Sequence, residues 1–319
     1  MKESRREFLL KSMIASAGIT LAPSVDLFAS DLAERPGRKS INVFSKNFHW
    51  LDYKGMADVA AQIGFDGIDI TVRPEGHVLP ERVAEDLPKA VEAVKNAGLR
   101  VDMITTAITN ADDPHTEPIL KAASSLGISY YRTGWINYDE KKSMDDNLEF
   151  FRSQMSKLAT LNRKYKIHGD YQNHSGLSFG SPIWDLWMII KDLDTQWIGS
   201  QFDVMHAQVE GGNTWQLSLK LLRSYIKTID IKDFAWMKTE AGWKAEVVPI
   251  GEGMIDYKKY LQLLKEYGLD GPFSMHFEYP LGGVENGAKQ ITVTKEEVIK
   301  AMKRDLTKFR SMLSEAGIL

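Results

Sequence analysis

Cysteine is absent from the 319-residue sequence, which excludes disulfide bonds, a thiolate metal site and a cysteine nucleophile. An excess of basic charge is absent too, because 40 Lys and Arg residues face 43 Asp and Glu residues, giving a formal net charge of −3. Proteins that bind the nucleic-acid backbone carry a basic surface, so no nucleic-acid partner is expected. The rest of the composition, 43% hydrophobic and 26% charged, is that of an ordinary globular protein.

A long hydrophobic run is missing near the N-terminus, where the apolar stretch 13–21 contains Ser and Gly and is too short to span a bilayer. The stretch follows Arg5 and Arg6 in segment 4–11, which resembles a twin-arginine (Tat) export signal. We therefore predict a Tat signal peptide over residues 1–30, export by the Tat machinery to the periplasm, and no stable membrane insertion after cleavage. A basic N-terminal helix is the alternative.

Short β-branched runs alternate with amphipathic segments about eight times along the rest of the chain. This order predicts an α/β fold, a single (β/α)8 TIM barrel over residues 38–319. A doubly wound open sheet is the structural alternative, but no Gly-rich phosphate loop follows the first strand. The predicted strands are 40–45, 67–72, 100–106, 129–133, 167–173, 198–204, 226–232 and 272–278, and the clearest helices are 81–97, 144–165, 256–267 and 295–315.

Histidines gather where such a barrel has its active site. Six of the seven follow the end of a predicted strand, and only His168 begins one. The C-terminal ends of the strands carry the active site in this fold, so the histidines indicate a polar mouth there. The six are His49, His77, His115, His174, His206 and His276.

Polar pairs also occupy the inward positions of the last four predicted strands. Residues two apart on a strand point to the same face, and a barrel interior is ordinarily filled by Val, Ile and Leu. Buried carboxylates are costly unless they are paired or bind a metal, so four consecutive polar pairs indicate a site. The pairs are Asp170 and Gln172, Gln201 and Asp203, Asp230 and Lys232, and His276 and Glu278.

Six segments together resemble a sugar phosphate isomerase/epimerase of the xylose isomerase-like TIM-barrel superfamily, which also includes inosose dehydratases and endonuclease IV-type enzymes. The resemblance covers residues 40–316, and its last four segments in order are the more specific ones. The segments are Gly64-Phe65-Asp66-Gly67-Ile68-Asp69, Tyr171-Gln172-Asn173-His174, Asp203-Val204-Met205-His206-Ala207, Ile231-Lys232-Asp233-Phe234, Pro249-Ile250-Gly251-Glu252-Gly253 and His276-Phe277-Glu278.

The resemblance implies one divalent metal held by Glu, Asp, His and Glu on strands five to eight. Asp203 and Glu278 match that pattern, whereas Gln172 stands at the first Glu position and Asp230 at the His position. The expected metal ligands are therefore Gln172, Asp203, Asp230 and Glu278, with His206 as a further candidate. This oxygen-rich set favours Mn²⁺ or Mg²⁺ over Zn²⁺. The alternative is that the metal is lost and Lys232 neutralises the acids.

The same departures limit the chemistry that the resemblance implies. Epimerases of the family use two glutamates on opposite sides of the substrate carbon, and Gln172 cannot exchange a proton at neutral pH. One remaining base, Glu278, suits aldose–ketose isomerisation or an elimination beside a ketone. Both reactions abstract the proton α to a carbonyl and need the resulting enediolate stabilised, a role expected of Lys232 and the metal.

Other polar residues near predicted strand ends are expected to bind substrate. Trp135 is placed to stack on a sugar ring, and Trp236 and Trp243 flank a long loop after strand seven that could form a lid. The full set of expected substrate-binding residues is Arg73, His77, His115, Arg132, Trp135, His174 and His276.

Together these features predict an exported, metal-assisted carbohydrate isomerase/epimerase-like enzyme that abstracts a proton α to a sugar carbonyl. Phosphorylated sugars stay in the cytoplasm, so a free or oxidised sugar is the expected small-molecule substrate. Two alternatives remain: a 3-keto-glycoside lyase or hydratase using the same site, and a non-catalytic periplasmic sugar-binding protein.

Overall fold

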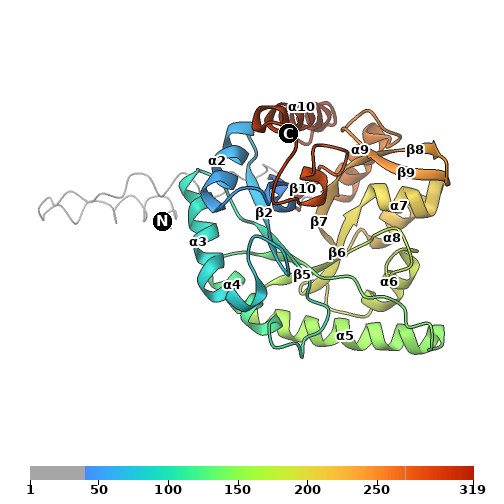
Figure 1. The fold of residues 1–319 in the computed structure, drawn as a ribbon. Helices are drawn as coiled ribbons and strands as arrows, with labels where there is room; N and C mark the ends of the chain where they lie inside the picture. The colour runs from blue at the N-terminus through green and yellow to red at the C-terminus, as the bar shows by residue number, and fades with distance from the viewer. Residues whose placement is uncertain (1–39, 270) are drawn as a thin grey trace, which may run out of the picture. The chain divides into compact units, whose positions relative to one another are not determined.

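Eight parallel strands close into a barrel in the computed structural model, which describes residues 40–269 and 271–319. The strands follow one another around the barrel in the order β1-β10-β7-β6-β5-β4-β3-β2, with helices outside them (Figure 1). The (β/α)8 prediction is thus confirmed; the predicted signal peptide lies outside the described residues. The barrel strands are β1 (Ile41–Phe44), β2 (Gly67–Val72), β3 (Met103–Thr106), β4 (Tyr130–Arg132), β5 (His168–Gln172), β6 (Ile198–Asp203), β7 (Ile226–Ile231) and β10 (Phe273–Met275).

Two long helices of the outer ring begin and end where the sequence predicts. The Ser143 side chain accepts a hydrogen bond from Asp146 N at the start of α5, and Thr294 and Glu297 form a capping box at the start of α10. In the part of the chain that the structure describes, no helix is both long and apolar enough to cross a membrane. The helices are α2 (Tyr53–Ile63), α3 (Val83–Asn96), α4 (Thr116–Ser125), α5 (Met144–Tyr165), α6 (Trp184–Ile190), α7 (Val204–Gly211), α8 (Trp215–Leu222), α9 (Tyr257–Tyr267) and α10 (Lys295–Glu315).

The register of the strands brings the predicted polar positions to the C-terminal end of the barrel. Gln172 of β5 pairs with Gln201 of β6, and Asp203 of β6 pairs with Asp230 of β7. Met275 pairs with Ile231, so the residues that follow β7 and β10 leave the barrel at the same end. The last residues of β5 to β7 and the first residues after β7 and β10 therefore meet at the C-terminal mouth.

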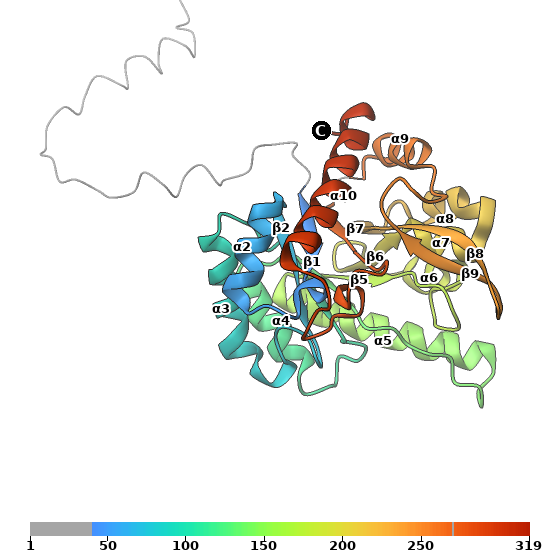
Figure 2. The same ribbon diagram turned by 45° about the horizontal axis from the view of Figure 1, so that its top comes forward.

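The segment expected as a long loop after strand seven is an antiparallel hairpin of β8 (Asp233–Thr239) and β9 (Gly242–Val248). Its base is held by the Asp233 carboxylate, which accepts hydrogen bonds from the backbone N–H groups of Phe234, Gly251, Gly253 and Ile255. The hairpin lies beside α7 in both views (Figures 1 and 2). Trp236 and Trp243 are 40% and 68% exposed on it, so the hairpin carries apolar surface beside the mouth.

Candidate active site

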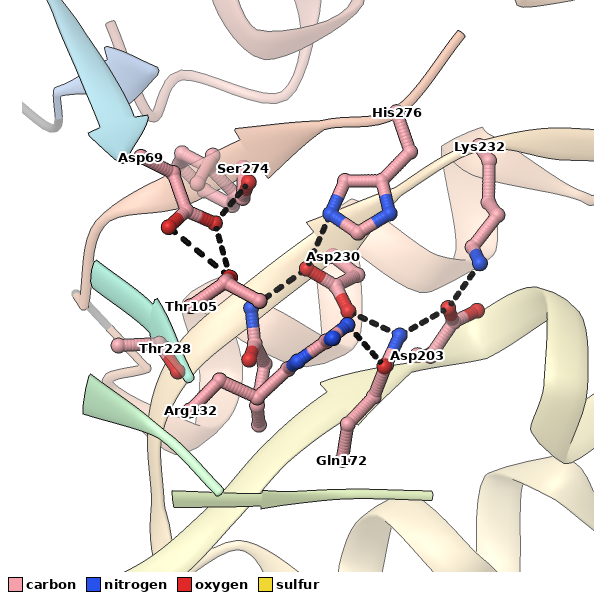
Figure 3. Close-up of polar contacts among 12 residues, drawn as sticks. Asp69, Thr105, Arg132, Gln172, Asp203, Thr228, Asp230, Lys232, Ser274 and His276 are labelled. Atoms are coloured by element: carbon pink, nitrogen blue, oxygen red, sulfur yellow. Dashed lines mark hydrogen bonds and ion pairs between the residues drawn. The ribbon is translucent and has the colours of Figure 1, made fainter. Parts of the chain in front are cut away.

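A buried lysine lies at the centre of the mouth, among three acceptors from three different elements. Lys232 Nζ is 3.0 Å from Asp203 Oδ2, 3.1 Å from Glu278 Oε2 and 3.0 Å from His206 Nε2. The lysine is only 2% exposed, and Figure 3 shows its side chain reaching Asp203. We name these three acceptors, Asp203, Glu278 and His206, the lysine tripod.

Local backbone geometry positions two members of the lysine tripod together. Asp203 ends β6 and caps α7, and its Oδ1 accepts a hydrogen bond from His206 N at 3.2 Å. Asn173 fixes the backbone of Asp203 by bonding both its N–H and its carbonyl oxygen, each at 2.9 Å. His206 Nδ1 lies 2.9 Å from Ser175 Oγ. Because an ammonium only donates, the Nε2 atom that faces Lys232 is the acceptor, and His206 is neutral.

Lys232 and the two carboxylates of the lysine tripod stabilise one another's charged forms. Burial by itself lowers the pKa of Lys232, but the carboxylates of Asp203 and Glu278 outweigh it and hold that pKa above the ordinary lysine value. Burial likewise raises the pKa of Glu278, yet Lys232 and Lys46 hold it well below the ordinary glutamate range. Burial, followed by the nearby Lys232 charge, keeps the pKa of His206 well below its usual value. At neutral pH the site therefore holds an ammonium, two carboxylates and a neutral imidazole.

Gln172 links the lysine tripod to Asp230 through its amide group (Figure 3). Arg132 Nη1 donates to Gln172 Oε1 at 2.7 Å. Gln172 Nε2 donates to Asp203 Oδ2 at 3.1 Å and to Asp230 Oδ2. The reverse orientation would place the amide NH₂ against the guanidinium and the carbonyl oxygen against two carboxylates. The neighbours thus determine which end of the amide faces the acids.

Asp230 is enclosed by donors on every side. Asp230 Oδ1 accepts a hydrogen bond from Gln201 Nε2 at 2.5 Å, and His276 Nε2 lies 3.1 Å from the same oxygen. The His276 ring stacks on Phe44 with centroids 4.3 Å apart, which holds the imidazole over Asp230. Asp230 is fully buried, so it belongs to the floor of the site and does not reach solvent.

Two further buried acids lie within the barrel and are hydrogen-bonded by neighbouring polar side chains. Asp69 accepts hydrogen bonds from Thr105 and Ser274 (Figure 3), and burial raises the pKa of its carboxyl group. Asp170 contacts His168 Nε2 at 2.8 Å and Thr228 Oγ1 at 2.7 Å. These contacts satisfy both acids inside the barrel, so we assign them a structural role.

Glu278 is the acid of the lysine tripod that reaches solvent. Its side chain is 24% exposed, whereas Asp203 has no exposed area. Lys46 Nζ lies 2.6 Å from Glu278 Oε1 and is itself partly exposed. Lys46 belongs to the 3-10 helix η1 (Ser45–Phe48) directly after β1. It was not among the residues predicted for the site, although its place just past a strand end is the same signal that marked the others.

Aromatic and cationic side chains form the rim beside Glu278. The Arg132 guanidinium lies 4.7 Å from the Trp135 ring centroid and 5.6 Å from that of Phe44. His174 stacks on His206 at 3.8 Å between centroids and contacts Trp135 at 4.6 Å. The Arg73 guanidinium also lies over Phe44, at 5.5 Å. The structure thus brings four of the expected substrate-binding residues together: Arg73, Arg132, Trp135 and His174.

Two of the expected substrate-binding histidines are placed differently. His77 Nε2 donates to Phe48 O at 3.1 Å and its Nδ1 lies 3.2 Å from Ser45 Oγ, so both ring nitrogens contact η1 and hold it to the segment after β2. Burial lowers the pKa of His77 to about 4, which keeps the ring neutral. His115 is exposed at the start of α4, where it lines a separate pocket with Val72 and Ile119.

The residues present do not fit the divalent metal that the sequence resemblance implies. A metal at the expected ligands needs the Gln172 oxygen to face Asp203 and Asp230, but that oxygen faces Arg132 and the NH₂ group faces the two acids. Lys232 fills the space between Asp203 and Glu278. Within residues 40–269 and 271–319, no three His, Asp or Glu side chains converge closely enough to hold a metal ion.

The chain is similar to known proteins in sequence and in fold. The chain is 26% identical over 235 residues to the uncharacterized protein MJ1311 of Methanocaldococcus jannaschii, covering 73% of this chain and 72% of that one. Its fold is similar to 3-keto-D-glucoside 4-epimerase YcjR from E. coli (TM-score 0.63, 14% identity, 86% and 100% of the two chains).

Two other solved structures show the same likeness of fold. One is the probable 3-DHS dehydratase AsbF from Bacillus anthracis (TM-score 0.63, 15% identity, 85% and 99% covered). The other is the IOLI protein with a bound zinc atom (TM-score 0.67, 16% identity, 87% and 99% covered). The Xylose isomerase-like TIM barrel family matches residues 57–301, and with the closed barrel this shows that the chain belongs to that family.

Proposed function

We propose that this protein is a carbohydrate isomerase/epimerase-like enzyme that abstracts the proton α to a sugar carbonyl, with Glu278 as the base. The observation that carries the proposal is the placement of one partly exposed carboxylate between two lysines, at 2.6 Å from Lys46 Nζ and 3.1 Å from Lys232 Nζ. The base is ionised and solvent-facing, and positive charge stands beside it where an enediolate develops negative charge.

The proposed step moves one proton and one electron pair. Glu278 takes the proton from the carbon beside the carbonyl, and the C–H electrons pass to the carbonyl oxygen, where Lys46 and Lys232 stabilise the negative charge. In isomerisation, a proton moves between the two enediolate oxygens and Glu278 returns its proton to the former carbonyl carbon. The amide of Gln172 cannot act as a second base, so exchange from one side of the substrate is expected.

A lyase reaction on a 3-keto-glycoside is the second candidate. It begins with the same proton abstraction, but the enediolate electrons then expel the group on the next carbon, which takes the proton from Glu278. The single base supports this reaction as well as it does isomerisation. The fold is shared with an epimerase of a 3-keto-D-glucoside and with a probable dehydratase.

The rim favours a sugar as substrate. Trp135 is 37% exposed and presents an aromatic face, which is the surface on which pyranose rings stack. Arg132 and His174 next to it, and Arg73 over the Phe44 ring, supply donors for hydroxyl groups. Arg132 and His174, which contact Trp135, also interact with the Glu278 charge, so binding and chemistry share one mouth.

Hydrogen–deuterium exchange at the substrate tests the proposal. The purified protein is incubated in D₂O with free and 3-keto sugars and followed by NMR. We expect deuterium at the carbon α to the carbonyl, loss of this exchange in Glu278→Gln, and retention in the matched control Glu92→Gln on the exposed face of α3. A sugar that binds without exchange, turnover or elimination would favour a non-catalytic sugar-binding protein instead.

We also propose that the protein is exported by the Tat route to the periplasm. The support is the sequence pattern alone, with Arg5 and Arg6 followed by a short apolar stretch. A reporter fused to residues 1–40 is expected in the periplasm, and replacement of both arginines by lysine is expected to keep it in the cytoplasm. A reporter that stays cytoplasmic with both arginines intact would contradict export.

A further inference from the structure

We infer that Lys232 is a built-in cation that takes the place of a divalent metal in this site, so that the protein functions without one. The first ground is the donor set around the ammonium. Two carboxylate oxygens and one imidazole nitrogen, from Asp203, Glu278 and His206, surround Lys232 Nζ at 3.0–3.1 Å. Such a combination of oxygen and nitrogen donors is one that metals bind in proteins.

The distances identify an ammonium site and not a metal site. Metals bonded to carboxylate and imidazole lie about 2.0–2.2 Å from their donors. The lysine tripod is wider by nearly an ångström for each donor, which matches the ordinary N–H···O and N–H···N spacing. His206 gives the ammonium its third acceptor, because Ser175 bonds the opposite ring nitrogen at 2.9 Å.

The charge balance of the mouth also leaves no place for a divalent ion. Three buried or half-buried carboxylates, Asp203, Asp230 and Glu278, are matched by three cations. Lys232 contacts Asp203 and Glu278, Lys46 contacts Glu278, and the Arg132 charge interacts most strongly with Asp230. Adding a divalent ion would leave two uncompensated positive charges beside the buried Asp203 and Asp230, which the low-dielectric interior disfavours.

Gln172 and Asp230 complete the arrangement from the neighbouring strands. An additional glutamate at position 172 would leave one carboxylate without a cation, whereas the amide donates to both Asp203 and Asp230. The glutamine is therefore matched to a site whose cation is a side chain. This inference concerns binding and does not depend on the proposed reaction.

Metal binding by the full-length protein and by Lys232→Ala tests the inference. Both are treated with chelator, exchanged into metal-free buffer and titrated with Mn²⁺ alone, with the free-ion EPR signal and calorimetry as readouts. We expect no saturable binding to the unmodified protein. Lys232→Ala is expected to bind one Mn²⁺ per chain, at least about tenfold more tightly than any binding to the unmodified protein, because the lysine tripod is then an unfilled cation site.

Thermal unfolding gives a further readout, which depends on neither the heat of binding nor the EPR signal. At a hundredfold excess over its dissociation constant, Mn²⁺ should raise the midpoint of Lys232→Ala by about 5 °C and leave the unmodified protein unchanged. Lys46→Ala is the matched control, since Lys46 contacts Glu278 but not Asp203 or His206. It should gain no Mn²⁺ site.

Two outcomes overturn the inference. One is saturable binding of one Mn²⁺ to the unmodified protein, which is decisive even if Lys232→Ala does not fold. The other is equal Mn²⁺ binding by folded Lys46→Ala and Lys232→Ala, because the lysine tripod would then not define the site. If the sugar assay shows no exchange of the proton α to the carbonyl, the two Mn²⁺-binding results are unaffected. Failure of the proposed reaction is therefore told apart from failure of this inference.

Discussion

Lys46 and Glu278 connect the segments that follow the first and the last strand of the barrel. Lys46 Nζ lies 2.6 Å from Glu278 Oε1, where β1 pairs with β10 and closes the barrel. The contact connects residues 232 positions apart in the chain. It leaves the other carboxylate oxygen for Lys232, so each oxygen of Glu278 faces its own ammonium. The state of this carboxylate therefore depends on both lysines.

Removal of Lys46 should change the pH dependence of the reaction. Lys232 and Lys46 hold the pKa of Glu278 well below the ordinary value, so Lys46→Met raises that pKa. Because the base acts only when ionised, the acid limb of the rate of deuterium exchange should move to higher pH. Lys54→Met, at an exposed ion pair on α2, is the control and should leave the limb in place.

Gln172→Glu should destabilise the fold. The substitution replaces the amide that donates to Asp203 and Asp230 by a third carboxylate among buried acids. We expect the free energy of unfolding in urea to fall by roughly 2–4 kcal/mol at pH 7.5. The exposed Gln262→Glu on α9 serves as the comparison and should change stability by less than about 0.5 kcal/mol. Equal stabilities of the two variants would contradict the described hydrogen bonds of Gln172.

Buried neutral histidine should make the fold sensitive to mild acid. Burial lowers the pKa of His77 to about 4, whereas in the unfolded chain it has the ordinary value near 6.5. Between these two pH values the unfolded state binds more protons, so stability falls as pH drops below about 6.5 and this loss ends near pH 4. At pH 5 the contribution of His77 should be about 1–2 kcal/mol less favourable than at pH 7.5.

Urea unfolding at these two pH values measures the effect. In His77→Gln the difference between pH 7.5 and pH 5 should shrink by that amount, although the variant is less stable at both. His115→Gln, at an exposed position, is the control. If the free energy of unfolding changes equally with pH in the unmodified protein and in His77→Gln, the prediction is wrong, because His77 would then be protonated as readily in the folded as in the unfolded state.

Asp233 should control the order of the segment that follows the hairpin. Its carboxylate accepts backbone hydrogen bonds at 2.9 Å from Gly251, 3.1 Å from Gly253 and 3.3 Å from Ile255. Asp233→Ala leaves these donors unpaired, and we expect faster amide exchange in residues 249–255 with a loss of about 2–3 kcal/mol in unfolding free energy. Asp256→Ala, which removes only the α9 cap, should leave the exchange of Gly251 unchanged.

Periodicity allowed the barrel to be predicted from the sequence. The bounds predicted for α5 and α10 are those observed, because Ser143 and Thr294 cap the helices through residues three positions away. Predicted β10 runs three residues beyond the observed strand, since the chain leaves the barrel before Glu278. The β8–β9 hairpin was missed because its strands pair with each other and not with the barrel.

The sequence by itself determined which residue types reach the mouth, because strand periodicity and the alternation of strand and helix depend on neighbours along the chain. Tertiary structure alone decided what those residues do there. Arg132, on a neighbouring strand, turns the Gln172 amide, and Ser175 leaves the His206 lone pair facing Lys232. Those orientations depend on contacts between distant segments, so spacing along the chain could name Lys232 and the acids but not show which of their atoms face one another.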